Sequence, residues 1–204
     1  AGYPESRRLK LGAVLVVELI SVTVTLADKP WGGDTMKKYD VVALGELLVD
    51  FTENGMSKQG NPMLEANPGG APCNVLSMLQ NLGKTTAFIG KVGADAFGRM
   101  LIDAVKNQGI NTENLMLDEN VHTTLAFVHT EEDGDRDFSF YRNPGADMML
   151  QWDEVNQDML GDTKIFHFGT LSMTEKQIET VTKRAVEKAK AEGAWISFDP
   201  NLRP

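Results

Sequence analysis

The stretch PGGAPCNVLSMLQNLG, residues 68–83, decides the fold class of this chain. Its second half repeats apolar side chains at helical spacing, namely Val75, Leu76, Met78, Leu79 and Leu82. This stripe predicts an amphipathic helix over residues 71–82, which Gly83 would end as a C-terminal stop. Pro72 is well suited to the first turn of such a helix. The stretch therefore predicts a glycine-rich turn that leads directly into a helix.

Strand-like and helix-like segments alternate on both sides of this helix. Residues 39–45 (YDVVALG) form a short, continuous apolar run that ends at glycine, which is typical of a strand covered on both faces. The same patterns predict further strands at 85–93, 163–168 and 195–199 and further helices at 97–108 and 174–191. The alternation indicates an α/β fold, in which right-handed crossovers build a parallel sheet with helices on both faces.

Two segments interrupt the alternation. Residues 51–65 contain turn formers and few apolar side chains. Residues 123–128 and 137–142 flank the turn-rich sequence EEDGD, and Phe138 and Phe140 alternate with polar side chains. We expect a small separate sheet that leaves the main sheet at the carboxyl ends of strands, where open α/β sheets bind ligands. It is either a lid over a site or a hairpin without that role.

The composition limits the classes of partner. The chain has 204 residues, 42% of them hydrophobic, which is enough to bury a substantial core. The net charge of -9 argues against a nucleic-acid or anionic-membrane partner, because both require a basic protein face. The only cysteine, Cys73, cannot form an internal disulfide, which favours a cytoplasmic setting.

Residues 1–35 differ in composition from the rest of the chain. Glu18 and many β-branched residues in the apolar run at 11–27 argue against a membrane-spanning helix. A signal peptide is one alternative, because basic residues precede the run. The other is a translated leader or artefact, with a natural start at Met36. We adopt the second interpretation and assign residues 36–204 to the folded domain.

Several common motifs are not matched. Residues 93–100 (GADAFGRM) have the glycine spacing of a P-loop, but Arg99 and Met100 replace its lysine and its hydroxyl residue. We expect this segment to turn the chain from a strand into a helix. The sequence contains neither a dinucleotide-binding G-x-G-x-x-G nor a G-x-S-x-G hydrolase motif. Its 3 histidines are far apart, so we predict no metal site.

The turn before the helix at 71–82 is the strongest candidate site. Gly70 or Ala71 would be the cap residue, and neither has a side-chain oxygen, so several amides of the first turn are expected to lack internal partners. Asn74 adds a donor and an acceptor that a plain turn leaves unexplained. Asp50 follows the first strand, where a carboxylate can accept two hydroxyl hydrogen bonds, although a surface position is the alternative. Together with Gly69, these groups fit a polyhydroxylated ligand.

Four blocks of the sequence resemble one known family in order and spacing. They are VVALGELLVDF, NPGGAPCNVLSMLQNLG, IGKVGADAFGRML and FYRNPGADMML. The chain from residue 39 to 204 is similar to PfkB-type carbohydrate kinases of the ribokinase superfamily, and most of all to bacterial fructokinases. The resemblance implies a ribokinase-like three-layer α/β/α sandwich with a small β lid, whose segments would lie at about 51–67 and 115–142.

The resemblance also implies which residues bind the substrates. The acceptor-sugar site would consist of Asp50, Gly69, Gly70, Asn74 and, from the lid side, Arg142. The family's D-x-N-x-R element beside the phosphates is matched by Asp199, Asn201 and Arg203, where an arginine suits an anionic group.

The implied reaction transfers the γ-phosphoryl group of ATP to a hydroxyl of a sugar, expected to be fructose, with the help of Mg²⁺. Family members often pair through the lid, so a homodimer is possible by analogy. An alternative acceptor is 2-keto-3-deoxygluconate or a nucleoside, because the same residues would serve them. A sugar-binding module without catalysis is the alternative from another class.

The chain departs from the family in one respect. The second family signature, a glycine-rich G-A-G-D segment with the catalytic base and the anion hole, does not occur in the sequence. Phosphoryl transfer depends on positioning and preorganised charge. We therefore expect a C-terminally truncated fragment that is inactive alone, and we assign no catalytic residue.

Overall fold

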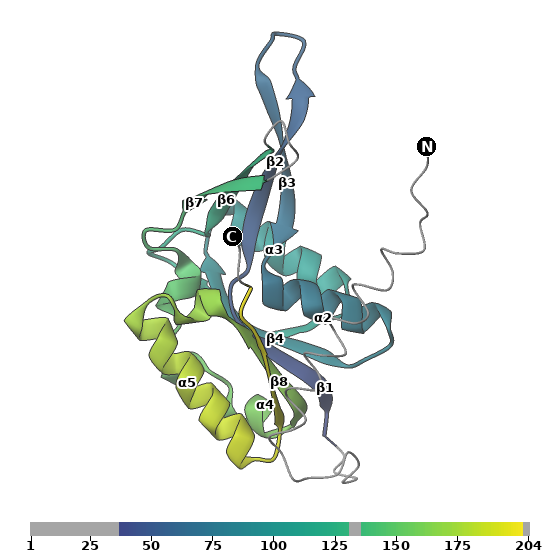
Figure 1. Ribbon diagram of the computed structural model, residues 1–204, viewed down its shortest axis with the longest axis vertical. Helices are drawn as coiled ribbons and strands as arrows, with labels where there is room; N and C mark the ends of the chain where they lie inside the picture. Colours follow the sequence, from purple (N-terminus) through teal and green to yellow (C-terminus); the bar gives the residue numbers. More distant parts are fainter. Residues whose placement is uncertain (1–36, 131–135, 202–204) are drawn as a thin grey trace, which may run out of the picture. The chain divides into compact units, whose positions relative to one another are not determined.

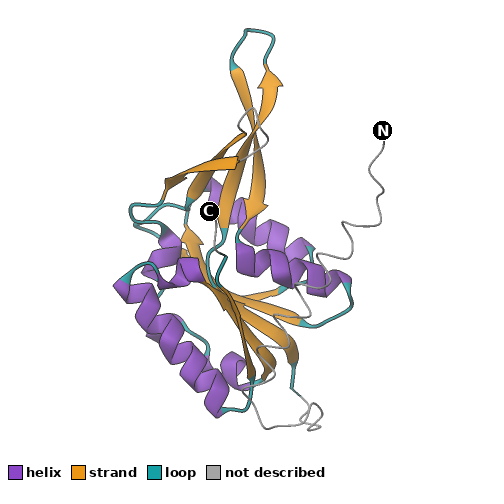
Figure 2. Ribbon diagram, in the orientation of Figure 1, coloured by secondary structure: helices purple, strands orange, loops and turns teal. Residues whose placement is uncertain are grey.

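The computed structural model describes residues 37–130 and 136–201, and the leader expected at 1–35 lies outside them. The main sheet has five parallel strands in the order β5-β4-β1-β8-β9 (Figures 1 and 2). They are β1 (Tyr39–Leu44), β4 (Thr86–Gly93), β5 (Asn111–Asp118), β8 (Thr163–Gly169) and β9 (Trp195–Asp199). The central strand β1 is buried from Val41 to Leu44, which explains its continuous apolar sequence.

Helices cover both faces of the main sheet, as Figure 1 shows. They are α2 (Ala71–Asn81), α3 (Ala96–Asn107), α4 (Gln157–Gly161) and α5 (Lys176–Ala191). Val41 and Ala43 of β1 belong to the core beneath α2 and α3, whereas Val42 and Leu44 belong to the core beneath α4 and α5. The predicted α/β/α layers are therefore confirmed. None of the helices among the described residues is long and apolar enough to cross a membrane.

A second sheet has four strands in the order β3-β2-β6-β7. They are β2 (Leu48–Met56), β3 (Pro62–Gly69), β6 (Leu125–Thr130) and β7 (Arg136–Tyr141). β2 pairs antiparallel with β3 and parallel with β6, and β6 pairs antiparallel with β7. Phe127 lies between Phe51 and Tyr141, with ring centroids 5.1 Å and 5.2 Å apart. The small separate sheet predicted from the interrupting segments is present.

The lid segment expected from residue 115 begins too early. Residues 115–118 belong to β5 and pair with β4 at the edge of the main sheet. Within β5, only Asn114 and Leu115 are buried, because an edge strand is covered less completely than a central one. NTENLMLD consequently lacks the apolar run that marks the other strands of this sheet.

The helix expected from Thr174 begins two residues later, at Lys176. Thr174 instead follows the short 3₁₀ helix η4 (Thr170–Met173), and its hydroxyl donates a hydrogen bond to the carbonyl oxygen of Leu171 at 2.9 Å. A threonine can close a preceding turn as well as cap a following helix, and sequence alone did not distinguish the two.

The glycine-spaced segment at 93–100 turns the chain from β4 into α3, as predicted. Asp95 is the N-cap of α3, and its side chain accepts hydrogen bonds from the main-chain N of Gly98 at 2.8 Å and of Thr123 at 2.9 Å. A Cβ atom at Gly98 would lie 1.9 Å from the carbonyl oxygen of Gly93. The glycine spacing therefore serves close packing of the turn.

The buried face of β4 provides a test of the fold. Phe88 is fully buried beneath α2 and α3, whereas Met78 on α2 is 61% exposed. Phe88→Ala is expected to lower the free energy of unfolding by about 3–5 kcal/mol, because it leaves a cavity in the core. Met78→Ala is the matched control and should change it by less than about 0.5 kcal/mol. Urea denaturation followed by circular dichroism measures both, and similar losses for the two variants would contradict this core.

Candidate functional site

The carboxyl ends of β1 and β8 meet the start of α2. Gly45 follows β1, and a Cβ atom there would lie 2.5 Å from Cγ of Pro72. Gly169 ends β8, and its Cβ atom would lie 3.9 Å from the same Pro72 atom and 3.6 Å from the carbonyl oxygen of Asp199. The glycine-proline turn, the centre of the sheet and the end of β9 thus come together at one edge, which is where open α/β sheets bind ligands.

The turn before α2 requires glycine at position 70. Gly70 is the N-cap of α2 with φ 122° and ψ 118°, a conformation that other L-residues rarely adopt. A Cβ atom there would lie 2.4 Å from the carbonyl oxygen of Glu46, in the loop between β1 and β2. Gly70 therefore packs directly on that loop.

Glu46, which the sequence analysis missed, caps α2. The residue is 2% exposed, and its Oε1 accepts a hydrogen bond from the main-chain N of Ala71 at 2.9 Å. Pro72 has no N–H group. The expectation that several first-turn amides lack partners was wrong for Ala71, because a side chain distant in the sequence replaces the local cap. The sequence signal that could have indicated this cap is an acidic residue directly after the apolar run VVALG.

Asp50 lies against the same turn. It belongs to β2 of the second sheet and not to the carboxyl end of β1, because β1 ends at Leu44 and a short loop follows. Asp50 pairs with Asn67 of β3, and a Cβ atom at Gly69 would lie 2.2 Å from Oδ2 of Asp50. The structure therefore brings the Asp50 carboxylate, Gly69 and Gly70 together.

Asn74 lies on the first turn of α2 with an exposed side chain, and its main-chain N donates to the carbonyl oxygen of Gly70 at 3.0 Å. Asn74 and Gly69 line a small cavity of about 40 Å³ between α2 and α3. Asp50 does not line it. Asp50 and Asn74 therefore flank the same turn without sharing this cavity.

Arg142 follows β7 and has buried surroundings. Its side chain is 9% exposed, and Nε and Nη2 donate to Oδ2 of Asp147 at 2.8 Å and 2.6 Å. Nη1 donates to Oγ1 of Thr174 at 2.9 Å, and Nη2 donates to the carbonyl oxygen of Leu171 at 3.1 Å. Asp147 also accepts a hydrogen bond from Oγ1 of Thr124, just before β6. The structure thus places Arg142 between the second sheet and η4, and its contact with a sugar stays a prediction.

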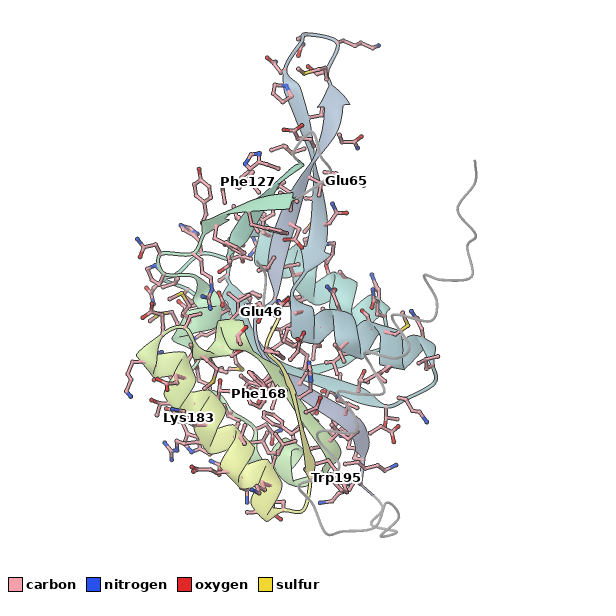
Figure 3. All side chains as sticks on the ribbon, viewed as in Figure 1. Glu46, Glu65, Phe127, Phe168, Lys183 and Trp195 are labelled. Carbon is pink, nitrogen blue, oxygen red and sulfur yellow. The ribbon has the colours of Figure 1, made fainter. Side chains whose placement is uncertain are left out.

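The charges of Arg142 and Asp147 act on Glu46, which lies where the main sheet meets the second sheet (Figure 3). Burial raises the pKa of the Glu46 carboxyl to about 7. Hydrogen bonding by its own main chain and by the main chain of Ala71 opposes this rise of the pKa, as does the positive charge of Arg142, whereas the negative charge of Asp147 adds to it. Its Oε2 is buried without a hydrogen-bond partner among the described residues.

The D-x-N-x-R element is only partly described. Asp199 ends β9, and its Oδ1 accepts a hydrogen bond from the main-chain N of Asn201 at 2.8 Å. Asn201 has φ 42°, in the left-handed region. Arg203 lies outside the described residues.

Among residues 37–130 and 136–201, no three His, Cys, Asp or Glu side chains are placed to hold a metal ion. Nδ1 of His167 lies 3.0 Å from Oγ of Ser197, between β8 and β9. Cys73 is buried, and burial together with the charge of Glu46 raises the pKa of its thiol to about 12. An uncharged thiol is a poor nucleophile.

Two glycines test the packing of the turn. Gly70→Ala is expected to cost about 3 kcal/mol of stability, because it combines backbone strain with the contact at Glu46. Gly83→Ala is the matched control, since Gly83 has φ 75° but no atom within 4 Å of its Cβ position. We expect about 1 kcal/mol for Gly83→Ala, from backbone strain alone. Thermal and urea unfolding measure both, and equal losses would refute the packing contact.

The buried carboxyl predicts a pH dependence of stability. Above the ordinary Glu pKa of 4.5 and below about 7, the folded state keeps a proton on Glu46 that the unfolded state has released. The free energy of unfolding should therefore fall as the pH rises from 4.5 to 7, by up to about 3 kcal/mol. Glu46→Gln should remove this part of the slope, whereas Glu53→Gln, at an exposed position of β2, should keep it. Urea unfolding at pH 5, 6 and 7 gives the slopes, and a wild-type slope in Glu46→Gln would disprove the assignment.

Comparisons with known proteins agree with this architecture. A family model described as pfkB family carbohydrate kinase matches residues 38–204. A protein named probable fructokinase-5 from Arabidopsis thaliana is 43% identical over 165 residues, which are 80% of this chain and 51% of that protein. The chain thus spans about half the length of the curated relatives that it matches.

Solved structures extend the comparison to the fold. The crystal structure of fructokinase from Xylella fastidiosa matches with a TM-score of 0.76 at 35% identity, over 81% of this chain and 52% of that one. The structure of fructokinase with bound ATP from Xylella fastidiosa matches with a TM-score of 0.74 at 35% identity, over 81% and 50% of the two chains. The fold is the ribokinase-like α/β/α sandwich with a small second sheet. The chain belongs to the pfkB family of carbohydrate kinases.

Proposed function

We propose that this chain forms the acceptor-binding part of an ATP-dependent sugar kinase, with fructose as the acceptor. The observation that carries the proposal is the contact between the Asp50 carboxylate and the Gly69-Gly70 turn at the start of α2. The names of the relatives from Arabidopsis and Xylella support fructose as the sugar.

Each of these groups has a chemical role in the proposal. The carboxylate of Asp50 accepts hydrogen bonds from two sugar hydroxyls. Gly69 and Gly70 leave room for the Asp50 carboxylate and for the carbonyl oxygen of Glu46, so the carboxylate is held directly beside the turn that the sugar would meet. Asn74 offers a donor and an acceptor from the first turn of α2, and Arg142 completes the site from the second sheet, which acts as the lid.

ATP and Mg²⁺ are the proposed cofactors, and the Xylella structure with bound ATP supports the nucleotide. Oδ1 of Asp199 is engaged by Asn201, and no metal-binding cluster occurs among the described residues. We assign Asp199, Asn201 and Arg203 to the neighbourhood of the phosphates and derive no step through the cofactors.

The proposal extends to the organisation of the protein. Residues 36–204 would form the N-terminal part of the kinase domain, with residues 1–35 outside it. The G-A-G-D segment that the resemblance associates with the catalytic base does not occur in the sequence, so these 204 residues alone are proposed to bind sugar without turnover. A cytoplasmic location is supported by the single cysteine, and a homodimer through the second sheet follows from analogy with the family.

Titration calorimetry of the chain with D-fructose tests the sugar site. We expect binding at millimolar concentration or tighter, and Asp50→Asn should weaken it by about 10- to 100-fold, because a charged hydrogen-bond acceptor is lost. Glu53→Gln is the matched control, since it neutralises an exposed carboxylate of the same strand. Its affinity should equal that of the wild type.

Other ligands distinguish the alternatives. If calorimetry detects binding of 2-keto-3-deoxygluconate or a nucleoside but no binding of fructose, that ligand replaces fructose as the proposed acceptor. Binding of fructose with equal affinity to Asp50→Asn would refute the proposed site. Fructose phosphorylation by the chain in the presence of MgATP would refute the proposed lack of turnover.

A further inference from the structure

Glu46 contacts the proposed sugar-binding turn through two different groups. Its Oε1 accepts the hydrogen bond from the main-chain N of Ala71 at 2.9 Å. Its own carbonyl oxygen lies where a side chain at Gly70 would be, 2.4 Å from the Cβ position. The side chain and the main chain of one buried residue therefore hold adjacent residues of the turn.

No local side chain can replace this contact. The N-cap residue Gly70 has no side-chain oxygen, and the first turn of α2 carries no acidic residue. Pro72, in that same first turn, has no N–H group. The partial positive charge at the start of this 11-residue helix is therefore met by the Glu46 carboxyl.

The Glu46 carboxyl uses only one of its two oxygens to cap α2. Oε2 is buried and has no hydrogen-bond partner among the described residues. The charged or titratable groups that act on the carboxyl from the surrounding elements are Arg142, Asp147 and the Cys73 thiol. The charge of Glu46 is consequently held in the protein interior by the start of α2 and by Arg142.

We propose that Glu46 is a positioning residue that sets the geometry of the sugar-binding turn by capping α2, and that its charge couples sugar affinity to pH. This inference rests on the proposed function of the turn. The charged carboxylate accepts a stronger hydrogen bond from Ala71 than the neutral acid does. It therefore fixes Gly69, Gly70 and the first turn of α2 more firmly.

The pH dependence of binding has the opposite sign to that of stability. Charging Glu46 costs desolvation and lowers the global stability of the fold, but it strengthens the cap at the turn. Because the carboxyl titrates near neutral pH, sugar affinity should rise by about fivefold between pH 6 and pH 8. A residue with only a structural role would move stability and affinity in the same direction.

The experiment is calorimetric titration of the chain with D-fructose at pH 6 and pH 8, for the wild type, Glu46→Gln and Glu53→Gln. Glu46→Gln keeps the shape and one acceptor oxygen, and it should bind fructose about fivefold more weakly than the wild type at pH 8, with the same affinity at both pH values. Glu53→Gln should follow the wild type. A wild-type affinity and pH profile in Glu46→Gln would overturn the proposal.

Amide hydrogen exchange separates this inference from the proposed function. If the wild type binds no fructose at either pH, the sugar site is refuted, and the cap is judged from exchange at Ala71 alone. Glu46→Gln should lose protection there relative to the wild type and Glu53→Gln, and the wild type should be less protected at pH 6 than at pH 8 after correction for the intrinsic rate. Unchanged protection would overturn the positioning role.

Discussion

The close packing of the turn at Gly69, Gly70 and Pro72 on the ends of β1 and β8 is the constraint on which the site depends. Gly45 leaves room for the Pro72 ring, and Gly70 leaves room for the carbonyl oxygen of Glu46. Each of these two contacts removes space for a side chain, so both glycines are fixed by packing, and Gly70 is fixed by its conformation as well. The Asp50 carboxylate fills the space beside Gly69 and is positioned by the same contact.

Buried charge then connects the two sheets. Arg142 follows β7 and bonds Asp147, which accepts a hydrogen bond from Thr124 before β6. The same guanidinium bonds Leu171 and Thr174 around η4, beside the main sheet. The buried carboxyl of Glu46 reduces stability near neutral pH, because its charged form is desolvated, but its charge strengthens the cap of α2. The uncharged form of Glu46 therefore favours stability, whereas the charged form favours positioning of the ligand.

The sequence predicted the fold well wherever an element is buried on a defined face. β1, β4 and β8 were found as short apolar runs, and the stripe on α2 gave its length to within one residue. The edge strand β5 was missed, because its half-exposed residues mix polar and apolar side chains. The start of α5 was misplaced, because Thr174 serves the preceding 3₁₀ helix.

The sequence by itself determined the α/β class, the glycine-proline turn before α2 and the identity of Asp50 and Asn74 as candidates. These depend on local periodicity, backbone conformation and side-chain chemistry, which are properties of short segments. Only the tertiary structure decided that Asp50 reaches the turn from the second sheet, that Arg142 is held by Asp147, and that Glu46 caps α2 across 25 residues of chain. A hydrogen bond between segments distant in sequence leaves no periodic pattern, because it is set by how the two sheets pack and not by the residues next to it.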